Sequence, residues 1–348
     1  MTHLGPPRRR RLLGLGLLAA LTALLLVPGV AVGSQTLPLG VVHDALVHAL
    51  SCPDGPFSCA ALSADEEIVR EMRIPRTALA LITGLALGLA GALIQGYTRN
   101  PLADAGLLGL TSGAAFLSAL GIYLFALTAP QQYIWFAFAG TLIAGLVVFG
   151  VSRIGGSSGS PLGLLLAGAA MAALLQALTN AIVTLDAYAL DTYRFWVIGE
   201  VAGRDASVFW QVLPFLVAGT LLALSAAPGL NLIGLGDDVA RGLGVDLGRS
   251  RALGFTAVVL LCGAATAAAG PIAFLGLIAP YLARKFTGPD QRWLLPYSAL
   301  FGAVVLLFAD IAGRVVARPG ELQTGVMLSL LGAPFFILLV RRRKLVRA

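Results

Sequence analysis

The sequence has 348 residues, of which 58% are hydrophobic and only 12% are charged, and its mean hydropathy is +0.88. Water-soluble domains carry about 25% charged residues. The composition therefore excludes a soluble enzyme or a soluble binding module and predicts one all-α membrane domain over residues 1–348. Membrane topology is enough to explain the net charge of +7, so we expect no nucleic-acid partner.

About ten apolar stretches follow one another, and most are long enough to cross a bilayer as a helix, which takes about 20 residues. The seventh and eighth nearly fuse at Gly270–Pro271. Two longer polar segments remain, an outer loop over 33–72 and a cytoplasmic loop over 229–250. The expected crossings are Leu12–Val32, Thr77–Tyr97, Gly106–Ala126, Trp135–Val151, Leu162–Leu185, Val208–Ala227, Ala252–Gly270, Ile272–Phe286, Leu294–Val316 and Gly325–Val340.

Basic residues predict the orientation, because Lys and Arg gather on the cytoplasmic side of a membrane protein. With both chain ends inside, 17 of the 24 Lys and Arg are cytoplasmic, including Arg8–Arg11 and Arg341–Lys344. We therefore expect a multi-pass protein of the cytoplasmic (inner) membrane. The run Arg8–Arg11 is also typical of a twin-arginine export signal, but the apolar stretch after it is long enough to be an uncleaved first helix.

The outer loop contains two cysteines and two histidines. Cys52 and Cys59 bracket a turn rich in Pro and Gly, on the side of the membrane where disulfides persist. We predict a disulfide between them, with free thiols as the alternative. The two cysteines have no nearby residues to complete a closed metal site, so no metal is expected. His43 and His48 lie on an amphipathic segment and are interpreted as solvent-facing.

The chain is expected to have no catalytic residues and no cofactor. A nucleotide-hydrolysing phosphate loop needs a Gly-Lys pair, but Lys285 and Lys344 each follow an arginine. Metalloprotease and serine-hydrolase motifs are also missing from the sequence. Asp310 lies within a predicted crossing, and Arg314 can pair with it one helical turn later; a proton relay is the alternative.

Three stretches resemble the permeases of bacterial ABC importers for iron–siderophores, haem and cobalamin. The first begins at Arg73–Arg76 and continues to NPLADAGLLGLTSGAA at 100–115. The second is GLGDDVARGLGVDLGRSRALG at 234–254, which leads into AGPIAFLGLIAPYLAR at 269–284. The third is GPDQRWLLPYSALFGAVVLLFADIAGR at 288–314, followed by PGELQTG and GAPFFILLVRRR. Together they touch nearly every crossing in the order found in the family.

The resemblance implies a polytopic helical fold with inverted-repeat halves. A faint internal repeat, Leu107–Leu110 against Phe274–Leu277, is consistent with such halves. The resemblance also implies three kinds of partner: two copies of an ABC ATPase subunit, an extracytoplasmic substrate-binding protein, and a second permease copy or homologue. ATP hydrolysis would then take place in the ATPase subunit.

The polar inner segment would be the part that docks into the ATPase. Asp237 and Asp238 open a short predicted helix there, because negative charge suits a helix N-terminus, and Gly242 or Gly244 closes it. A solvated connector is the alternative. The resemblance assigns ATPase coupling to Asp237, Asp238, Ala240, Arg241, Gly242, Leu243 and Gly244.

Arg73, Arg76 and Arg314 lie at outer helix ends, where the topology does not need positive charge. In the resembling permeases, arginines at the matching places pair with carboxylates of the binding protein, and the planar guanidinium suits such pairs. We therefore expect binding-protein docking at these three residues. The alternatives are contact with lipid headgroups and, for Arg314, the pair with Asp310.

The resemblance places a translocation path along the fifth and last crossings, where an uncharged polar stripe suits a solute that must pass without sticking. Hydrogen bonding between helices is the alternative. The predicted path residues are Gln176, Asn180, Thr184, Gln323 and Thr324. The inner gate is expected at Ser160, Pro161 and Leu162, which depart from the family's usual small hydroxyl pair.

Together these observations predict the membrane permease of an ATP-driven importer for a metal chelate. An iron(III)–siderophore is the leading substrate, with haem and cobalamin next. An ion-coupled secondary transporter that needs no ATPase is the alternative, and an intramembrane enzyme is a third possibility.

Overall fold

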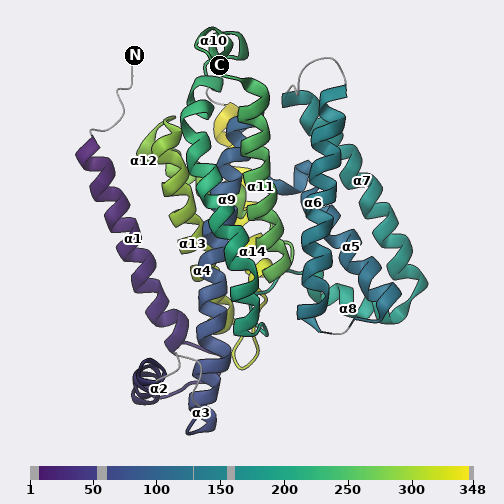
Figure 1. Ribbon diagram of the computed structural model, residues 1–348. Helices are drawn as coiled ribbons and strands as arrows, with labels where there is room; N and C mark the ends of the chain where they lie inside the picture. Colours follow the sequence, from purple (N-terminus) through teal and green to yellow (C-terminus); the bar gives the residue numbers. More distant parts are fainter. Residues whose placement is uncertain (1–7, 53–60, 128, 155–160, 345–348) are drawn as a thin grey trace.

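The computed structural model describes residues 8–52, 61–127, 129–154 and 161–344 (Figure 1), and all regular structure in these residues is helical. The first half contains α1 Arg8–Ala31, α2 Leu39–Ser51, α3 Ala64–Glu67, the π-helix η1 Ile68–Arg73, α4 Ile74–Thr98, the 3₁₀ helix η2 Ala105–Leu108, α5 Leu110–Phe125, α6 Pro130–Ile154 and α7 Pro161–Leu185. The second half contains α8 Ala187–Val197, α9 Ala206–Ile233, α10 Asp237–Gly242, α11 Leu247–Ala269, α12 Leu275–Thr287, α13 Gln291–Val316 and α14 Thr324–Lys344.

Every predicted crossing coincides with a helix. Seven helices in the described residues are long and apolar enough to span a membrane, namely α1, α4 with its N-terminal extension, α6, α7, α9, α11 and α13. The other three predicted crossings correspond to α5, α12 and α14, which are shorter or less apolar. The polytopic all-helical fold is therefore confirmed, whereas the count of ten crossings is not.

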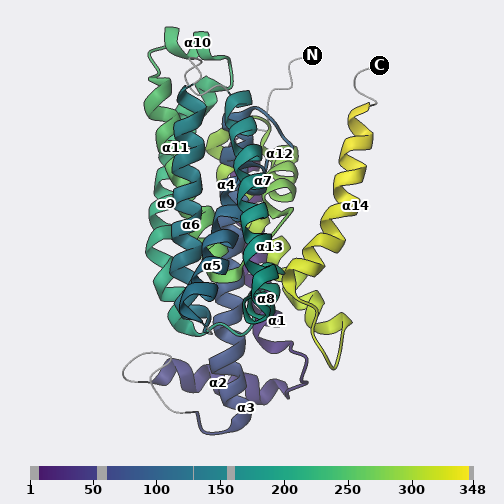
Figure 2. The ribbon, with the colours of Figure 1, turned by 90° about the vertical axis from the view of Figure 1, so that its right-hand side faces the viewer.

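Short helices lie at both ends of the bundle (Figures 1 and 2). At one end are α10, the start of α1 and the end of α14, and at the other are α2, α3 and α8. Acidic side chains cap helices at the α10 end: Asp246 accepts from Arg249 N at 3.0 Å, and Asp290 accepts from Arg292 N at 3.1 Å. The basic residues predicted to be cytoplasmic also gather there, so this is the inner end.

The central helix of the bundle is α4, which packs against α9, α11, α12 and α13. Small residues on α4 allow this, because a missing side chain lets two backbones approach closely. A Cβ added at Gly84 or Gly88 would overlap the backbone of α13, and one added at Gly91 would overlap Gly276 on α12. These glycines therefore allow α4 to pack closely against α12 and α13.

The second stretch of the internal repeat, at the start of α12, contacts α4 and the turn that follows α4. After α4 the chain turns back, and Asp104 caps η2 by accepting a hydrogen bond from Ala105 N at 2.8 Å. The Asp104 carboxylate lies against Gly276 at the start of α12. From α4, Gln95 Nε2 donates to Gly276 O at 3.1 Å. The start of α12 is therefore held against the inner half of α4 and the turn after it.

Candidate functional site

The inner polar segment folds into α10, as predicted. Gly236 and Gly244 flank it with φ of 120° and 84°, values that favour glycine. Asp237 and Asp238 occupy the first turn and Arg241 the last, which matches the helix dipole. The glycines on both sides allow sharp turns, so α10 projects from the inner end as a separate short helix (Figure 2).

One side of this segment is buried and the other is exposed. Ala240 is the buried residue of α10. Leu235, Val239 and Leu243 are 64%, 50% and 58% exposed. These apolar side chains lie at the cytoplasmic end, outside the candidate membrane spans, where water and not lipid would surround them. Exposed apolar residues that are close together in water indicate a protein contact.

The two adjacent acids of α10 have different surroundings. The side chain of Asp238 is 97% exposed and pairs only locally, with Arg241 at 2.8 Å. Asp237 accepts from Arg251 Nη2 at 2.7 Å and also pairs with Arg99. Burial raises the pKa of the Asp237 carboxyl, but the hydrogen bonds and charges of Arg251 and Arg99 outweigh burial, so the pKa lies below its ordinary value.

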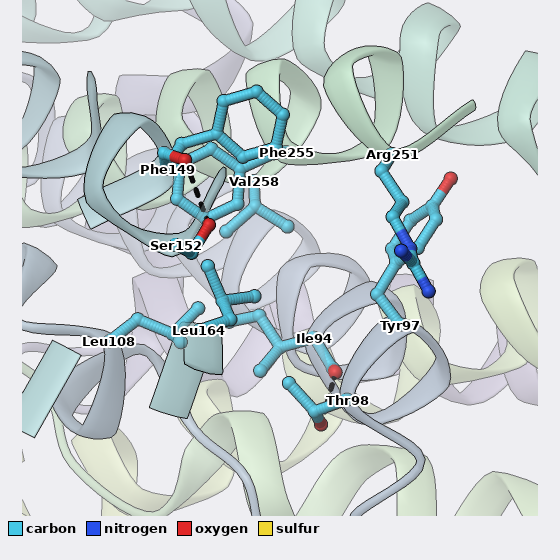
Figure 3. Close-up of a pocket in the computed structure, with 10 residues that line it drawn as sticks. All are labelled: Ile94, Tyr97, Thr98, Leu108, Phe149, Ser152, Leu164, Arg251, Phe255 and Val258. Carbon is cyan, nitrogen blue, oxygen red and sulfur yellow. Dashed lines mark hydrogen bonds between the residues drawn. The ribbon is translucent and has the colours of Figure 1, made fainter. Parts of the chain in front are cut away.

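Next to this ion pair, a small apolar pocket separates the inner ends of α4 and α11 from α6 and α7 (Figure 3). Tyr97 and Arg251 lie side by side at one end of the pocket. Phe149 and Phe255 stack at the other end, with ring centroids 5.1 Å apart. The Tyr97 hydroxyl donates to Ser250 O at 2.8 Å. Polar bonds therefore join α4 and α11 at this inner end.

The three arginines predicted to dock the binding protein are buried at the outer end. Arg73 Nη1 donates to Ala31 O at 2.6 Å, and Arg73 Nη2 donates to Gln35 O at 2.7 Å. Arg314 Nη1 donates to Gly29 O at 2.6 Å. The bonds to Gly29 and Ala31 satisfy carbonyls that the end of α1 would otherwise leave without partners.

Asp310 is the centre of the outer ion cluster. It is fully buried and pairs with Arg314, which confirms the predicted pair one helical turn apart. Arg76 Nη2 lies 2.8 Å from Asp310 Oδ1, and Arg76 also pairs with Glu321, which lies between α13 and α14. The Thr324 hydroxyl donates to Asp310 Oδ1 at 3.2 Å. The predicted path residue Thr324 is thus enclosed in this cluster.

The other predicted path residues are more accessible. On α7, Gln176 Nε2 donates to Asn180 Oδ1 at 3.1 Å, and Thr184 is bonded to its own helix. All three are exposed or half-exposed, on a helix at the edge of the bundle (Figure 1). Gln323 is half-buried just before α14. Their role in a path stays a prediction.

The predicted gate and disulfide lie partly beyond the described residues. Ser160 and Cys59 are outside them, Pro161 begins α7, and Leu162 is exposed. Cys52 is disulfide-bonded. In the part of the chain that the structure covers, no three His, Cys, Asp or Glu residues cluster as a metal site would require.

Comparison with known proteins identifies the family. The sequence matches the FecCD transport family over residues 19–342. The chain belongs to the FecCD transport family. It is 46% identical to the ferric enterobactin transport system permease protein of Escherichia coli K12, over 90% of each chain. It is 38% identical to the hemin transport system permease protein of Yersinia pestis, over 78% of this chain and 83% of that one.

A solved structure gives the same answer for the fold of this FecCD protein. It is described as an inward-facing conformation of a metal-chelate type ABC transporter, and it matches with a TM-score of 0.80 at 26% identity. The match covers 94% of this chain and 98% of the other. The predicted resemblance to ABC importer permeases and the location in the inner membrane are therefore confirmed.

Two residues without a predicted role, Arg99 and Glu321, belong to these sites in the structure. In the sequence, Arg99 is only one of the basic residues that predict the orientation in the membrane. In the structure it pairs with Asp237. Glu321 lies in the PGELQTG motif, but its partner Arg76 is 245 residues away. Pairs so distant in the chain leave no local pattern, so the motif itself was the one available signal.

Proposed function

We propose that the chain is the transmembrane permease of an ATP-binding-cassette importer that passes an iron(III)–siderophore into the cytoplasm. The observation that carries the proposal is the short helix α10, which lies outside the membrane. Val239 on α10 and the flanking Leu235 and Leu243 are exposed. The charged residues Asp238 and Arg241 lie beside them. A rigid projection of this kind, apolar at its tip and charged at its sides, fits a groove on a soluble partner. The partner would be the ATPase subunit, in two copies.

The sequence indicates that ATP hydrolysis and transport are carried out by different subunits. The chain offers no Gly-Lys pair to hold terminal phosphates, so ATP hydrolysis is assigned to the partner. Binding of that partner to α10 would turn its movement into movement of the helices. The residues proposed for this contact are Asp238, Arg241, Gly242, Leu243 and Gly244, whereas Asp237 and Ala240 face the bundle.

At the outer end, the docking prediction is retained most strongly for Arg73. Its guanidinium donates to the neutral carbonyls of Val30, Ala31 and Gln35, and no carboxylate in the described chain lies within ion-pair distance. Arg76 and Arg314 already face Asp310 and Glu321. Arg73 also lines a cavity with Ser34, Gln35 and Glu321. A carboxylate of an extracytoplasmic binding protein would find unmatched positive charge there.

We further propose that the path forms between two permease subunits, this chain and a second copy or homologue. The polar residues of α7, namely Gln176, Asn180 and Thr184, would line it, with Gln323 near its outer mouth. Exposed leucines flank them on α7, as a contact between two permeases would need. Thr324 is left out of the proposed lining because it is enclosed by the Asp310 cluster.

The substrate is proposed from the relatives. Identity is 46% to a permease named for ferric enterobactin and 38% to one named for hemin. Both differ from a soluble small metabolite in being large chelates, and an uncharged polar lining suits such cargo. The higher identity favours an iron(III)–siderophore over haem.

Reconstitution tests the proposal. The permease, its ATPase and its binding protein are placed in proteoliposomes, and uptake of radioactive iron is measured with a catecholate siderophore, hemin or ferric citrate. We expect uptake of the siderophore that needs ATP inside and stops when the ATPase is left out. Uptake by the permease alone, driven by an ion gradient, would instead identify a secondary transporter and refute the proposal.

A further inference from the structure

The contact between α10 and the bundle depends on one carboxylate. Asp237 Oδ2 accepts from Arg251 Nη2 on α11 at 2.7 Å, and Asp237 Oδ1 pairs with Arg99 at the end of α4. Arg99 Nη2 also donates to Ile233 O at 2.7 Å, at the end of α9. A single side chain of the short helix is thus connected to the inner ends of three long helices.

The other connections of α10 are backbone hydrogen bonds, such as that from Val245 N to Ala240 O at 3.0 Å, and the packing of one small side chain. The glycines at 236 and 244 flank it, and an added Cβ at either would meet no atom within 4 Å. Ala240 is its one buried residue among those described, and a methyl group resists sliding only weakly. The Asp237 bonds are charge-assisted and directional, so they resist both pushing and pulling. Arg251 is only 10% exposed, which limits screening by salt.

The helices connected to Asp237 are the ones that could spread a movement. Arg99 follows α4, the central helix, which packs on α9, α11, α12 and α13. Tyr97, in the last turn of α4, donates to Ser250 O on α11. The inner ends of α4 and α11 are therefore bonded to each other as well as to α10. A displacement of α10 would reach the core of the bundle through these bonds.

We propose that Asp237, together with Arg99 and Arg251, is the positioning element that transmits movement of α10 to α4 and α11. Asp237 would not contact the ATPase itself, unlike the exposed Asp238 beside it. The inference rests on the proposed function, because it assumes that α10 meets the ATPase. It reassigns one residue of the predicted coupling set from the docking surface to the mechanical connection behind it.

The first experiment examines the purified full-length permease alone. Nitroxide labels on Val239 and Phe286, both exposed near the inner end, report the distance between α10 and α12 by pulsed electron resonance. We expect D237N and R251Q to broaden the distance distribution to about twice the wild-type width, because α10 loses its anchor. R249Q is the matched control: Arg249 is 91% exposed and pairs only with Asp246 on its own helix. Equal widths in all variants would overturn the inference.

The second experiment uses the reconstituted importer and measures substrate transported per ATP hydrolysed. We expect D237N and R251Q to lower this ratio about tenfold while ATP hydrolysis continues, and D237E to restore part of it. The double variant should be no worse than either single variant, because both break one connection. R249Q should keep the wild-type ratio. Loss of folding alone would lower hydrolysis and transport together and leave the ratio unchanged, which would also overturn the inference.

A crosslink separates failure of the inference from failure of the proposed function. A cysteine at Leu243 should crosslink to the ATPase subunit in wild-type and in D237N backgrounds. If the crosslink forms and the ratio is unchanged in D237N, α10 docks as proposed but Asp237 transmits nothing. If no crosslink forms in either background, the docking proposal fails, and the inference falls with it.

Discussion

Replacing Asp310 with asparagine removes the negative charge at the centre of the outer ion cluster. Asp310 is fully buried, Arg314 is 1% exposed, and Arg76 and Thr324 share the same carboxylate. Arg76 keeps Glu321 as a partner in the variant, but Arg314 keeps only backbone carbonyls. Removing one partner of a buried ion pair costs about 3–5 kcal/mol. Because the new amide oxygen can still accept a hydrogen bond, we expect a loss of about 3 kcal/mol, at the lower end of that range.

The free energy of unfolding of D310N can be measured by steric trapping in lipid bicelles. D191N is the control, because Asp191 pairs with Arg194 at the outer surface and both side chains are more than half exposed. Exposed pairs contribute about 0.2–1 kcal/mol, so D191N should stay close to wild type. If D310N loses less than about 1 kcal/mol, no more than D191N, the buried cluster does not stabilise the outer end and our reasoning about it is wrong.

Three further predictions concern packing, pH and docking. Gly91→Leu should lower the free energy of unfolding by about 3 kcal/mol, because the leucine side chain would overlap the Gly276 backbone. Gly150→Leu is the control and should leave the free energy of unfolding unchanged, because Gly150 faces open space. Equal losses in the two variants would contradict the packing. Burial raises the pKa of Glu321, but Arg76, with smaller contributions from Ser34 and Arg314, outweighs burial and lowers the pKa below its ordinary value of 4.5. The Glu321 contribution to stability should therefore be complete above pH 4.5 and be lost as pH falls through the lowered pKa. The unfolding free energies of wild type and E321Q should accordingly differ at pH 7 and converge below that pKa; a pH-independent difference would refute the pair. Arg73→Glu should weaken binding-protein affinity at least about tenfold by titration, whereas Arg194→Glu should not; unchanged affinity in both would remove Arg73 from docking.

Local sequence features predicted the helices and their ends. Apolar runs of near-membrane length, Pro and Gly at the breaks, and acids at helix starts depend only on neighbouring residues. They predicted the end of a crossing at Tyr97, one residue before the end of α4, and the short helix that opens at Asp237. The Asp310–Arg314 pair was predictable for the same reason, since its members lie one turn apart.

The amino-acid sequence was thus enough to predict the membrane-spanning helical fold of this FecCD protein and the class of permease it resembles, although not the number of crossings. Only the tertiary structure decided which residues share a site. It brought Arg76 to Asp310 across 234 positions of the chain, enclosed Thr324, and separated Asp237 from its neighbour Asp238. A buried charge in a membrane protein needs a counter-charge or backbone carbonyls as partners, and the packing of distant helices determines which partners those are.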